Sequence, residues 1–182
     1  SSLNTQAGAF TVTVTDPTGL APLVDNQVLQ AFCVDLQHFV TSPVGATLGA
    51  MSSWSIGGYP TGTNTEGTAR VAYLVNQYAS VGGNAAAVQI AIWELLYEAS
   101  NTFNVTSGNA WFSNVGAGTL TAAQNLINAS QLGQDAGWLQ TVNGSGQTAQ
   151  DFAVAVPDGG ATLALLGGAL MALGAARRRF GK

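Results

Sequence analysis

The sequence predicts an α+β fold: a β-sandwich or barrel with an inserted helical subdomain, followed by a hydrophobic helix at the C-terminus. Strand-like runs open the chain, a block with helical spacing follows between residues 66 and 130, and strand-like runs then return. A breaker containing Pro and Gly separates the last run from a charge-free apolar stretch. We therefore expect an extracellular domain over residues 1–155 and a separate tail over residues 156–182.

The strands are predicted from short runs bounded by turn residues. The clearest is AFTVTVT, where apolar and hydroxyl side chains alternate with period two before Asp16-Pro17 begins a turn. Strand-like segments are found at residues 9–15, 28–40, 47–56, 138–142 and 147–156.

The helical block contains three predicted helices. Residues 66–80 have apolar side chains at helical spacing, and Asn84 is a good N-cap for the helix that follows the Gly82-Gly83 break. Residues 85–99 (AAAVQIAIWELLYEA) contain no Gly or Pro and are apolar on most sides, which predicts a buried helix. A capping-box pattern at Thr121 predicts a third helix to about Ser130.

Charge is scarce and unevenly placed. Charged residues make up 8% of the 182 residues, far below the usual quarter, and this favours an extracellular or self-associating protein. Residues 1–156 contain eight acids, one arginine (Arg70) and no lysine, so their net charge is near −7. Such a surface repels phosphate backbones, so we expect no nucleic-acid partner.

Cysteine and ligand patterns restrict the chemistry further. Cys33 is the one cysteine, so an intramolecular disulfide is impossible. We find no metal-ligand spacing and no phosphate-binding glycine loop, and expect no metal and no cofactor. Because Ser1 opens the chain without an apolar leader, we interpret the sequence as a mature form from which a signal peptide was removed.

The tail has three parts in order. Val156, Pro157, Asp158, Gly159 and Gly160 form the breaker, residues 161–176 (ATLALLGGALMALGAA) carry no charge, and Arg177, Arg178 and Arg179 follow. Sixteen residues are fewer than the roughly 20 that a full span needs. The arginines favour a membrane stop with the basic end inside, and a buried terminal helix is the alternative.

This order resembles the PEP-CTERM family of sorting tails over residues 156–180. The usual motif of that family is Pro-Glu-Pro, whereas here it is a Val-Pro-Asp variant. The resemblance implies processing by an exosortase-type enzyme, transient membrane anchoring through the C-terminal helix, and export to the bacterial cell surface or extracellular matrix.

Two fragments of the body suggest chemistry. Cys33 lies in Phe32-Cys33-Val34-Asp35 on a predicted strand, and Gln89 lies in Val88-Gln89-Ile90-Ala91-Ile92-Trp93 on the buried helix. A buried amide without a partner costs a few kcal/mol, so Gln89 needs one. Gln89 and Trp93 are four residues apart and share a helix face.

Together the two fragments resemble the bacterial thioester-domain family of surface adhesins. The resemblance implies that the Cys33 sulfur condenses with the Gln89 side-chain amide, releasing ammonia, and that Phe32, Ile92 and Trp93 shelter the bond from water. A thioester acylates nucleophiles, so the implied partner is an amine- or hydroxyl-bearing surface or matrix target. Such a protein acts once per molecule and is not a turnover enzyme.

Other ionisable residues near these fragments have competing interpretations. Asp35 either orients or deprotonates a nucleophile, or is a strand-edge acid in water. We expect His38 to face away from Cys33 as a surface histidine, and Glu94 and Glu98 to form the solvated edge of the central helix.

Three other functions compete with covalent adhesion. The first is a non-covalent structural subunit of surface filaments or biofilm matrix, since low charge favours self-association. In that case Cys33 is a small buried hydrophobe and Gln89 an amide bonded to neighbouring backbone. A carbohydrate-binding module is suggested by aromatic residues near loops, namely Trp54, Tyr59, Trp111 and Trp138. A Cys-His hydrolase is the third, with His38 as the one available histidine.

Overall fold

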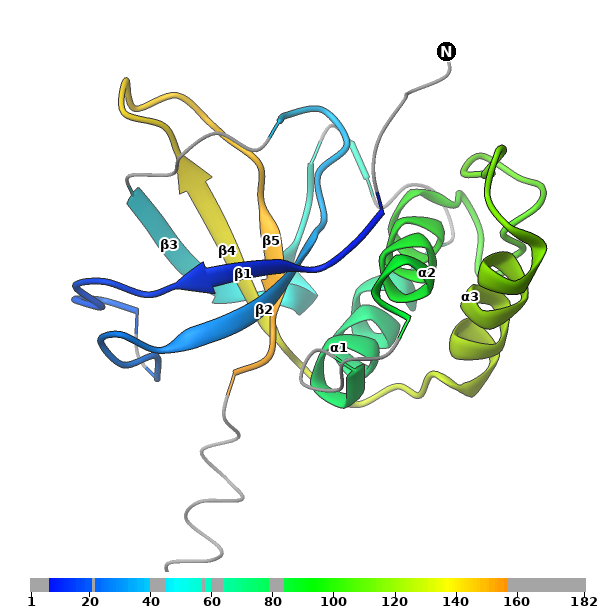
Figure 1. The fold of residues 1–182 in the computed structure, drawn as a ribbon, viewed down its shortest axis with the longest axis horizontal. Coiled ribbons are helices and arrows are strands. Elements are labelled where there is room, and N and C mark those ends of the chain that lie inside the picture. The colour runs from blue at the N-terminus through cyan, green and yellow to red at the C-terminus, as the bar shows by residue number, and fades with distance from the viewer. Residues whose placement is uncertain are drawn as a thin grey trace, which may run out of the picture.

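The computed structural model describes residues 7–20, 22–39, 45–56, 58–59, 64–78 and 84–156. Five strands build one sheet, and three α-helices form a block beside it (Figure 1). The predicted α+β class is confirmed, and so is the insertion of the helices between the early and late strands. The apolar stretch 161–176 lies outside the described residues, among which no helix is both long and apolar enough to span a membrane.

The sheet is antiparallel throughout, with the strand order β1-β2-β5-β4-β3. Its strands are β1 (Phe10–Thr13), β2 (Val28–Cys33), β3 (Gly45–Ala50), β4 (Gly137–Val142) and β5 (Phe152–Val154). The last strand of the sequence, β5, lies at the centre of the sheet, and all three of its residues are buried. This position places the residues before β5 next to the end of β2.

The helices follow β3 and a short 3-10 helix. They are η1 (Met51–Ser53), α1 (Gly67–Tyr78), α2 (Ala85–Tyr97) and α3 (Ala117–Ala129). The middle helix, α2, packs against α1, α3 and β2, and every residue from Ala87 to Tyr97 is buried. Its predicted burial is therefore confirmed. Asn84 is its N-cap as predicted, because the Asn84 side chain accepts a hydrogen bond from the Ala87 N–H at 3.0 Å.

Two expectations about the fold are wrong. The described strands form one open sheet and not a sandwich or barrel, because the apolar helical block supplies the second layer. The third helix begins at Ala117, four residues before the predicted capping box. Its N-cap residue is Gly116, which has no side chain with which to cap the helix. Thr121 therefore lies inside the helix.

The start of α1 fits closely against the end of α2. A Cβ atom placed on Gly67 would lie 2.0 Å from the Leu95 carbonyl oxygen. Buried Asn64, just before α1, donates to the carbonyl oxygens of Leu95 and Glu98 at 2.8 Å each, and accepts from the Gly67 N–H at 3.0 Å. One amide thus joins the beginning of one helix to the last turn of the other.

We expect Gly67→Ala to destabilise the protein by about 2 kcal/mol, because the added methyl group overlaps the Leu95 carbonyl oxygen, which is backbone and must shift. Gly118→Ala in α3 is the matched control, since nothing lies within 4 Å of a Cβ at that position. Without a clash, alanine there stabilises the helix by up to about 1 kcal/mol. Urea unfolding measures both, and equal effects of the two substitutions would contradict the close packing at Gly67.

Candidate functional site: the Cys33–Gln89 contact

Cys33 and Gln89 meet although they are 56 residues apart in the chain. The Cys33 N–H donates to Gln89 Oε1 at 2.9 Å, and Gln89 Nε2 donates to the Cys33 carbonyl oxygen at 2.7 Å. The Gln89 side chain therefore pairs with the main chain of the residue that bears the thiol. This pairing supplies the partner that a buried amide requires.

The pairing occurs where β2 extends beyond its neighbour β1. Pairing between these strands begins with Phe10 opposite Ala31, so it does not reach Cys33. The Val34 N–H donates to the Asp151 carbonyl oxygen on the other side of β2. Because main-chain groups alternate sides along a strand, those of Cys33 face away from β5. The Gln89 amide satisfies both of them, as a further strand would.

Both side chains lie in a dry environment. Gln89 is 0% exposed and Cys33 is 5% exposed. Burial, with a smaller effect of the nearby Asp35 charge, raises the pKa of the Cys33 thiol to about 12. The sulfur is therefore a neutral thiol at neutral pH, and Cys33 forms no disulfide.

An aromatic pair that the sequence analysis missed lies on the thiol's side of the sheet. Phe152 is directly opposite Cys33 across β2 and β5, so their side chains share a face. Phe10 packs edge-on against Phe152, with ring centroids 5.6 Å apart. Phe32, predicted to shelter the bond, is buried but points to the opposite face because it neighbours Cys33 in the strand.

The other predicted shelter residues lie on α2. Ile92 is 0% exposed, and Trp93 is 2% exposed and stacks on Phe112 with ring centroids 6.4 Å apart. Gln89, Trp93 and Tyr97 follow each other at intervals of four residues, so they form one stripe along the helix.

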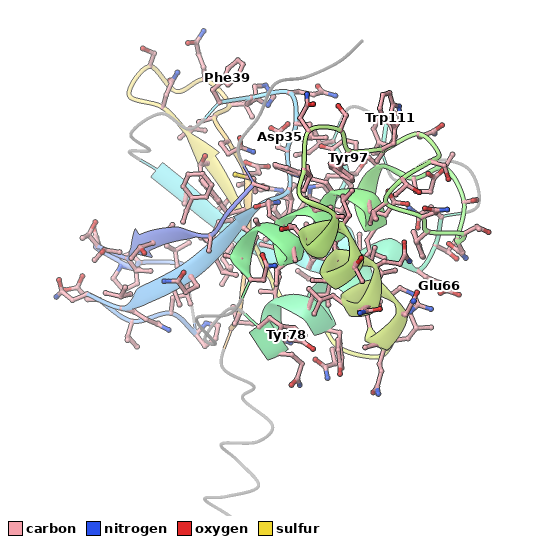
Figure 2. All side chains as sticks on the ribbon, turned by 45° about the vertical axis from the view of Figure 1, so that its right-hand side comes forward. Asp35, Phe39, Glu66, Tyr78, Tyr97 and Trp111 are labelled. Carbon is pink, nitrogen blue, oxygen red and sulfur yellow. The ribbon has the colours of Figure 1, made fainter. Side chains whose placement is uncertain are left out.

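Tyr97 extends this stripe to the residues after Cys33. Its hydroxyl donates to the Val34 carbonyl oxygen at 3.0 Å and accepts from the Leu36 N–H at 2.9 Å. Figure 2 shows Tyr97 and Asp35 near each other in the upper part of the view. One helix face thus holds the chain from Cys33 to Leu36 through four main-chain groups.

Asp35 and His38 form a pair, in which the Asp35 side chain is buried and that of His38 is 37% exposed. Asp35 is 1% exposed and is not a strand-edge acid in water. Its Oδ2 bonds to Nδ1 of His38, its Oδ1 accepts the Gln37 N–H at 2.6 Å, and its carbonyl oxygen accepts from the Gln150 amide. β2 ends at Cys33, so strand alternation no longer decides where these side chains point. The Asp35–Gln37 hydrogen bond turns His38 back toward Asp35.

A second buried carboxylate, missed in the sequence, stands beside this pair. Asp151 is 3% exposed; it accepts from Trp138 Nε1 at 3.0 Å and from the Thr141 N–H at 2.9 Å. Burial raises its pKa, and Asp35 adds to this effect while the two hydrogen bonds and His38 oppose it. The signal in the sequence that could have indicated a buried carboxylate is the position of Asp151 directly before the apolar run FAVAV.

His38 and Asp151 line a groove on the protein surface. The groove has a volume of about 570 Å³ and runs over residues of β3 and β4. Thr47, Gln140 and Trp138 are among its other lining residues. Its wall therefore combines hydroxyl and amide groups and two ionisable side chains with the Trp138 ring and apolar side chains, among them Ile56 and Val142.

Glu94 and Glu98 are buried, so their prediction as a solvated helix edge is wrong. They are 0% and 6% exposed, because the chain after α2 folds back over them. Glu94 accepts the Asn104 N–H at 2.6 Å, and Glu98 accepts the N–H groups of Ala99 and Asn109. Burial, opposed by the Asn104 hydrogen bond and reinforced by Glu98, raises the pKa of Glu94 to about 7.

The aromatic residues considered for carbohydrate binding are not all exposed. Trp54 and Trp138 are 2% and 8% exposed, so two of the four aromatic residues considered for carbohydrate binding lie in the core. No group of three or more His, Cys, Asp or Glu side chains that could hold a metal ion is found within the part of the chain that the structure describes.

Comparison with known families identifies the tail. The family model of the VPDSG-CTERM motif matches residues 155–180. Residues 155–180 are a VPDSG-CTERM sorting motif. The predicted Val-Pro-Asp sorting tail is thereby confirmed, and the motif implies an exported protein that an exosortase-type enzyme sorts to the cell surface. No curated protein and no solved structure matches the chain.

We expect Glu94→Gln to stabilise the protein at pH 8 by about 2 kcal/mol and to have little effect at pH 4. The pKa of Glu94 is about 7 in the folded protein against an ordinary 4.5, so the folded state binds this proton more tightly. The associated stability is complete below pH 4.5 and is lost as the pH rises through 7. Glutamine keeps the acceptor for Asn104 and has no proton to lose.

Denaturant unfolding at several pH values measures this effect. Glu98→Gln, at the C-cap of α2 and four residues beyond Glu94, is the matched control. Both Glu98 oxygens accept backbone N–H groups, so an amide NH₂ there opposes a donor and destabilises the protein at every pH. A Glu94→Gln variant whose stability difference from the natural protein does not change with pH would contradict the raised pKa.

Proposed function

We propose that this exported protein forms an internal thioester between Cys33 and Gln89 and attaches covalently through it to an amine- or hydroxyl-bearing target on a partner surface or matrix polymer. The observation that supports the proposal most directly is the pair of hydrogen bonds between the Gln89 amide and the Cys33 main chain. They hold the acyl carbon against the residue that supplies the sulfur.

The condensation is balanced without a further reactant. A bond forms between Cys33 Sγ and Gln89 Cδ, the bond between Cδ and Nε2 breaks, and the thiol proton leaves with Nε2 as ammonia. The Cys33 N–H already donates to Oε1 at 2.9 Å, which is the oxygen that becomes negative in the tetrahedral intermediate. The same hydrogen bond polarises the amide before attack.

Burial favours survival of the product. Hydrolysis of a thioester requires water at the acyl carbon, and Gln89 is 0% exposed. The leaving thiol has a pKa of about 12, so its thiolate is a poor leaving group until a proton reaches it. These two properties favour a bond that persists until a suitable nucleophile is bound. Each molecule reacts once, so the protein is not a turnover enzyme.

A non-covalent structural role is the second candidate. It is favoured by the completeness of the same contact, because both polar groups of the Gln89 amide have partners without any covalent step. In that case Gln89 serves to satisfy the main chain of β2 where β1 no longer pairs with it, and the exported protein is a subunit of surface filaments or matrix.

We expect the intact mass of the purified chain to be lower than the sequence mass by one ammonia. Methylamine should add to this form and release Cys33 as a thiol that iodoacetamide alkylates. Cys33→Ala and Gln89→Ala should each abolish the deficit and the methylamine adduct. Gln150→Ala is the matched control, since Gln150 is another buried amide bonded to main chain but is not paired with the cysteine.

Two results together would decide for the structural role: an intact mass equal to the sequence mass, and quantitative alkylation of Cys33 in the unfolded protein. The protein must be unfolded for the alkylation, because a buried thiol in the folded protein reacts slowly whether or not a thioester forms.

A further inference from the structure

The main chain of β1 is paired on one side. The Val14 N–H, just after the strand, donates to the Gln27 carbonyl oxygen at 2.9 Å, so the main-chain groups of Val14 face the β2 side. Because these groups alternate sides along a strand, those of Val12 also face β2, whereas those of Thr11 and Thr13 face outward. In the described sheet β1 is an edge strand that pairs with β2 alone. No described strand therefore lies beside its outward N–H and C=O groups.

This edge lacks the features by which proteins block strand addition. Edge strands are commonly protected by lysine, proline, a β-bulge or a covering segment. The fold uses such a cover where β2 extends past β1, since the Gln89 amide binds the main chain of Cys33. Residues 7–15 (AGAFTVTVT), by contrast, contain no charge and no proline. The pairing of β1 with β2 is also continuous from Phe10 to Thr13, without a bulge.

Composition makes β1 the better of the two edges for pairing. Its Phe, Thr and Val residues favour extended strands, and Thr11 and Thr13 are exposed. The opposite edge, β3 (GATLGA), contains two glycines, which weaken a strand because they have no side chain to pack and lose more conformational entropy on folding. The turn from β1 to β2 projects away from the helical block (Figure 1). A second strand thus meets no helix at this end of β1.

We propose that two copies of this protein pair antiparallel through β1, about a two-fold axis at Thr11, so that their sheets continue across the contact. A second copy fits the edge because the strand is its own partner under this symmetry. Thr11 exchanges both main-chain hydrogen bonds with Thr11 of the other copy, and the outward groups of Thr13 meet those of Ala9. The two Thr11 side chains lie opposite each other, which is a favourable cross-strand pair.

The sorting motif favours a second copy as the occupant of this edge. The motif implies export to the cell surface, where each molecule is surrounded by others that carry the same strand. A high local concentration makes a contact of a few main-chain hydrogen bonds effective. The contact is non-covalent and does not depend on the thioester.

The acids near β1 favour the antiparallel orientation. Asp16 follows the strand, and its N–H donates to Oδ1 of Asp25 at 3.1 Å, so two exposed carboxylates gather at one end of β1. With about 3.4 Å per residue, an antiparallel pair places the Asp16 residues of the two copies roughly 30 Å apart, several times the Debye length of about 8 Å at physiological salt. A parallel pair would place them side by side. The net charge near −7 of residues 1–156 still opposes the approach of two copies, so salt should strengthen the pairing.

The test is the dependence of molecular mass on concentration, measured by sedimentation of the full chain in a detergent that keeps the apolar stretch 161–176 dispersed. We expect the mass to rise from one copy toward two, and to do so at lower protein concentration in about 500 mM than in about 50 mM NaCl. In Thr11→Lys two lysines oppose each other at the axis, and the dissociation constant should rise at least about tenfold.

Thr47→Lys is the matched control, because Thr47 is an exposed threonine on the other edge strand, β3. Both substitutions reduce the net negative charge by one, which by itself favours association. A loss confined to Thr11→Lys therefore assigns the contact to β1. Association through the apolar stretch would be the same in both variants.

Amide hydrogen exchange gives an independent readout. The N–H groups of Thr11 and Thr13 should exchange rapidly in dilute protein and at least about tenfold more slowly where the pair is formed, because each then donates to the second copy. The Val12 N–H faces β2 in both states and is the internal control.

Three results would overturn the inference. The first is a natural chain that stays monomeric at its highest soluble concentration in the higher salt. The second is equal weakening by Thr11→Lys and Thr47→Lys, which would indicate a contact between β1 and β3 of different copies. The third is a dimer in which the Thr11 and Thr13 amides still exchange rapidly. Cys33→Ala should associate as the natural chain does, so the absence of a thioester leaves this inference intact, and failure to pair leaves the proposed function intact.

Discussion

The two hydrogen bonds between the Gln89 amide and the Cys33 main chain are the contact on which the arrangement of this protein depends. They connect the sheet to the central helix at the point where β2 extends beyond β1 and pairs with β5 alone. Both partners are buried, so breaking either bond would leave an unsatisfied polar group in the core, at a cost of about 1 to 3 kcal/mol. This penalty fixes the position of α2 along the end of β2.

Because these hydrogen bonds fix the position of α2, the periodicity of this helix determines which of its other side chains contact the segment after Cys33. Trp93 lies one turn beyond Gln89, and Tyr97 lies two turns beyond it. Tyr97 therefore meets the chain just past Cys33, where its hydroxyl bonds on both sides of Asp35. With its neighbours held in this way, Asp35 keeps its carboxylate buried and directs it toward His38. The spacing of α2 and the end of β2 thus together produce the packing that holds the Asp35–His38 pair.

The residues themselves show how far the sequence could predict this arrangement. The helix 85–99 was predictable because its side chains are apolar on most sides, and the need of Gln89 for a partner followed from its burial. That this partner is main chain could not be predicted, because it depends on β1 starting no earlier than Phe10. No local sequence pattern marks that boundary. Glu94 and Glu98 were misplaced because the segment after α2 covers them, and helix periodicity contains no information about a returning loop.

If the proposed thioester forms, the distribution of amines in the chain constrains what it reacts with. The chain contains a single lysine, Lys182, and it lies beyond the sorting motif. If processing by an exosortase-type enzyme removes the tail, residues 1–156 of a neighbouring copy present no lysine amine. The net charge of residues 1–156 is near −7, and it also repels other copies of the protein while attracting cations. On the proposed chemistry, both properties direct the acyl group away from self-crosslinking and toward amines carried by a different molecule.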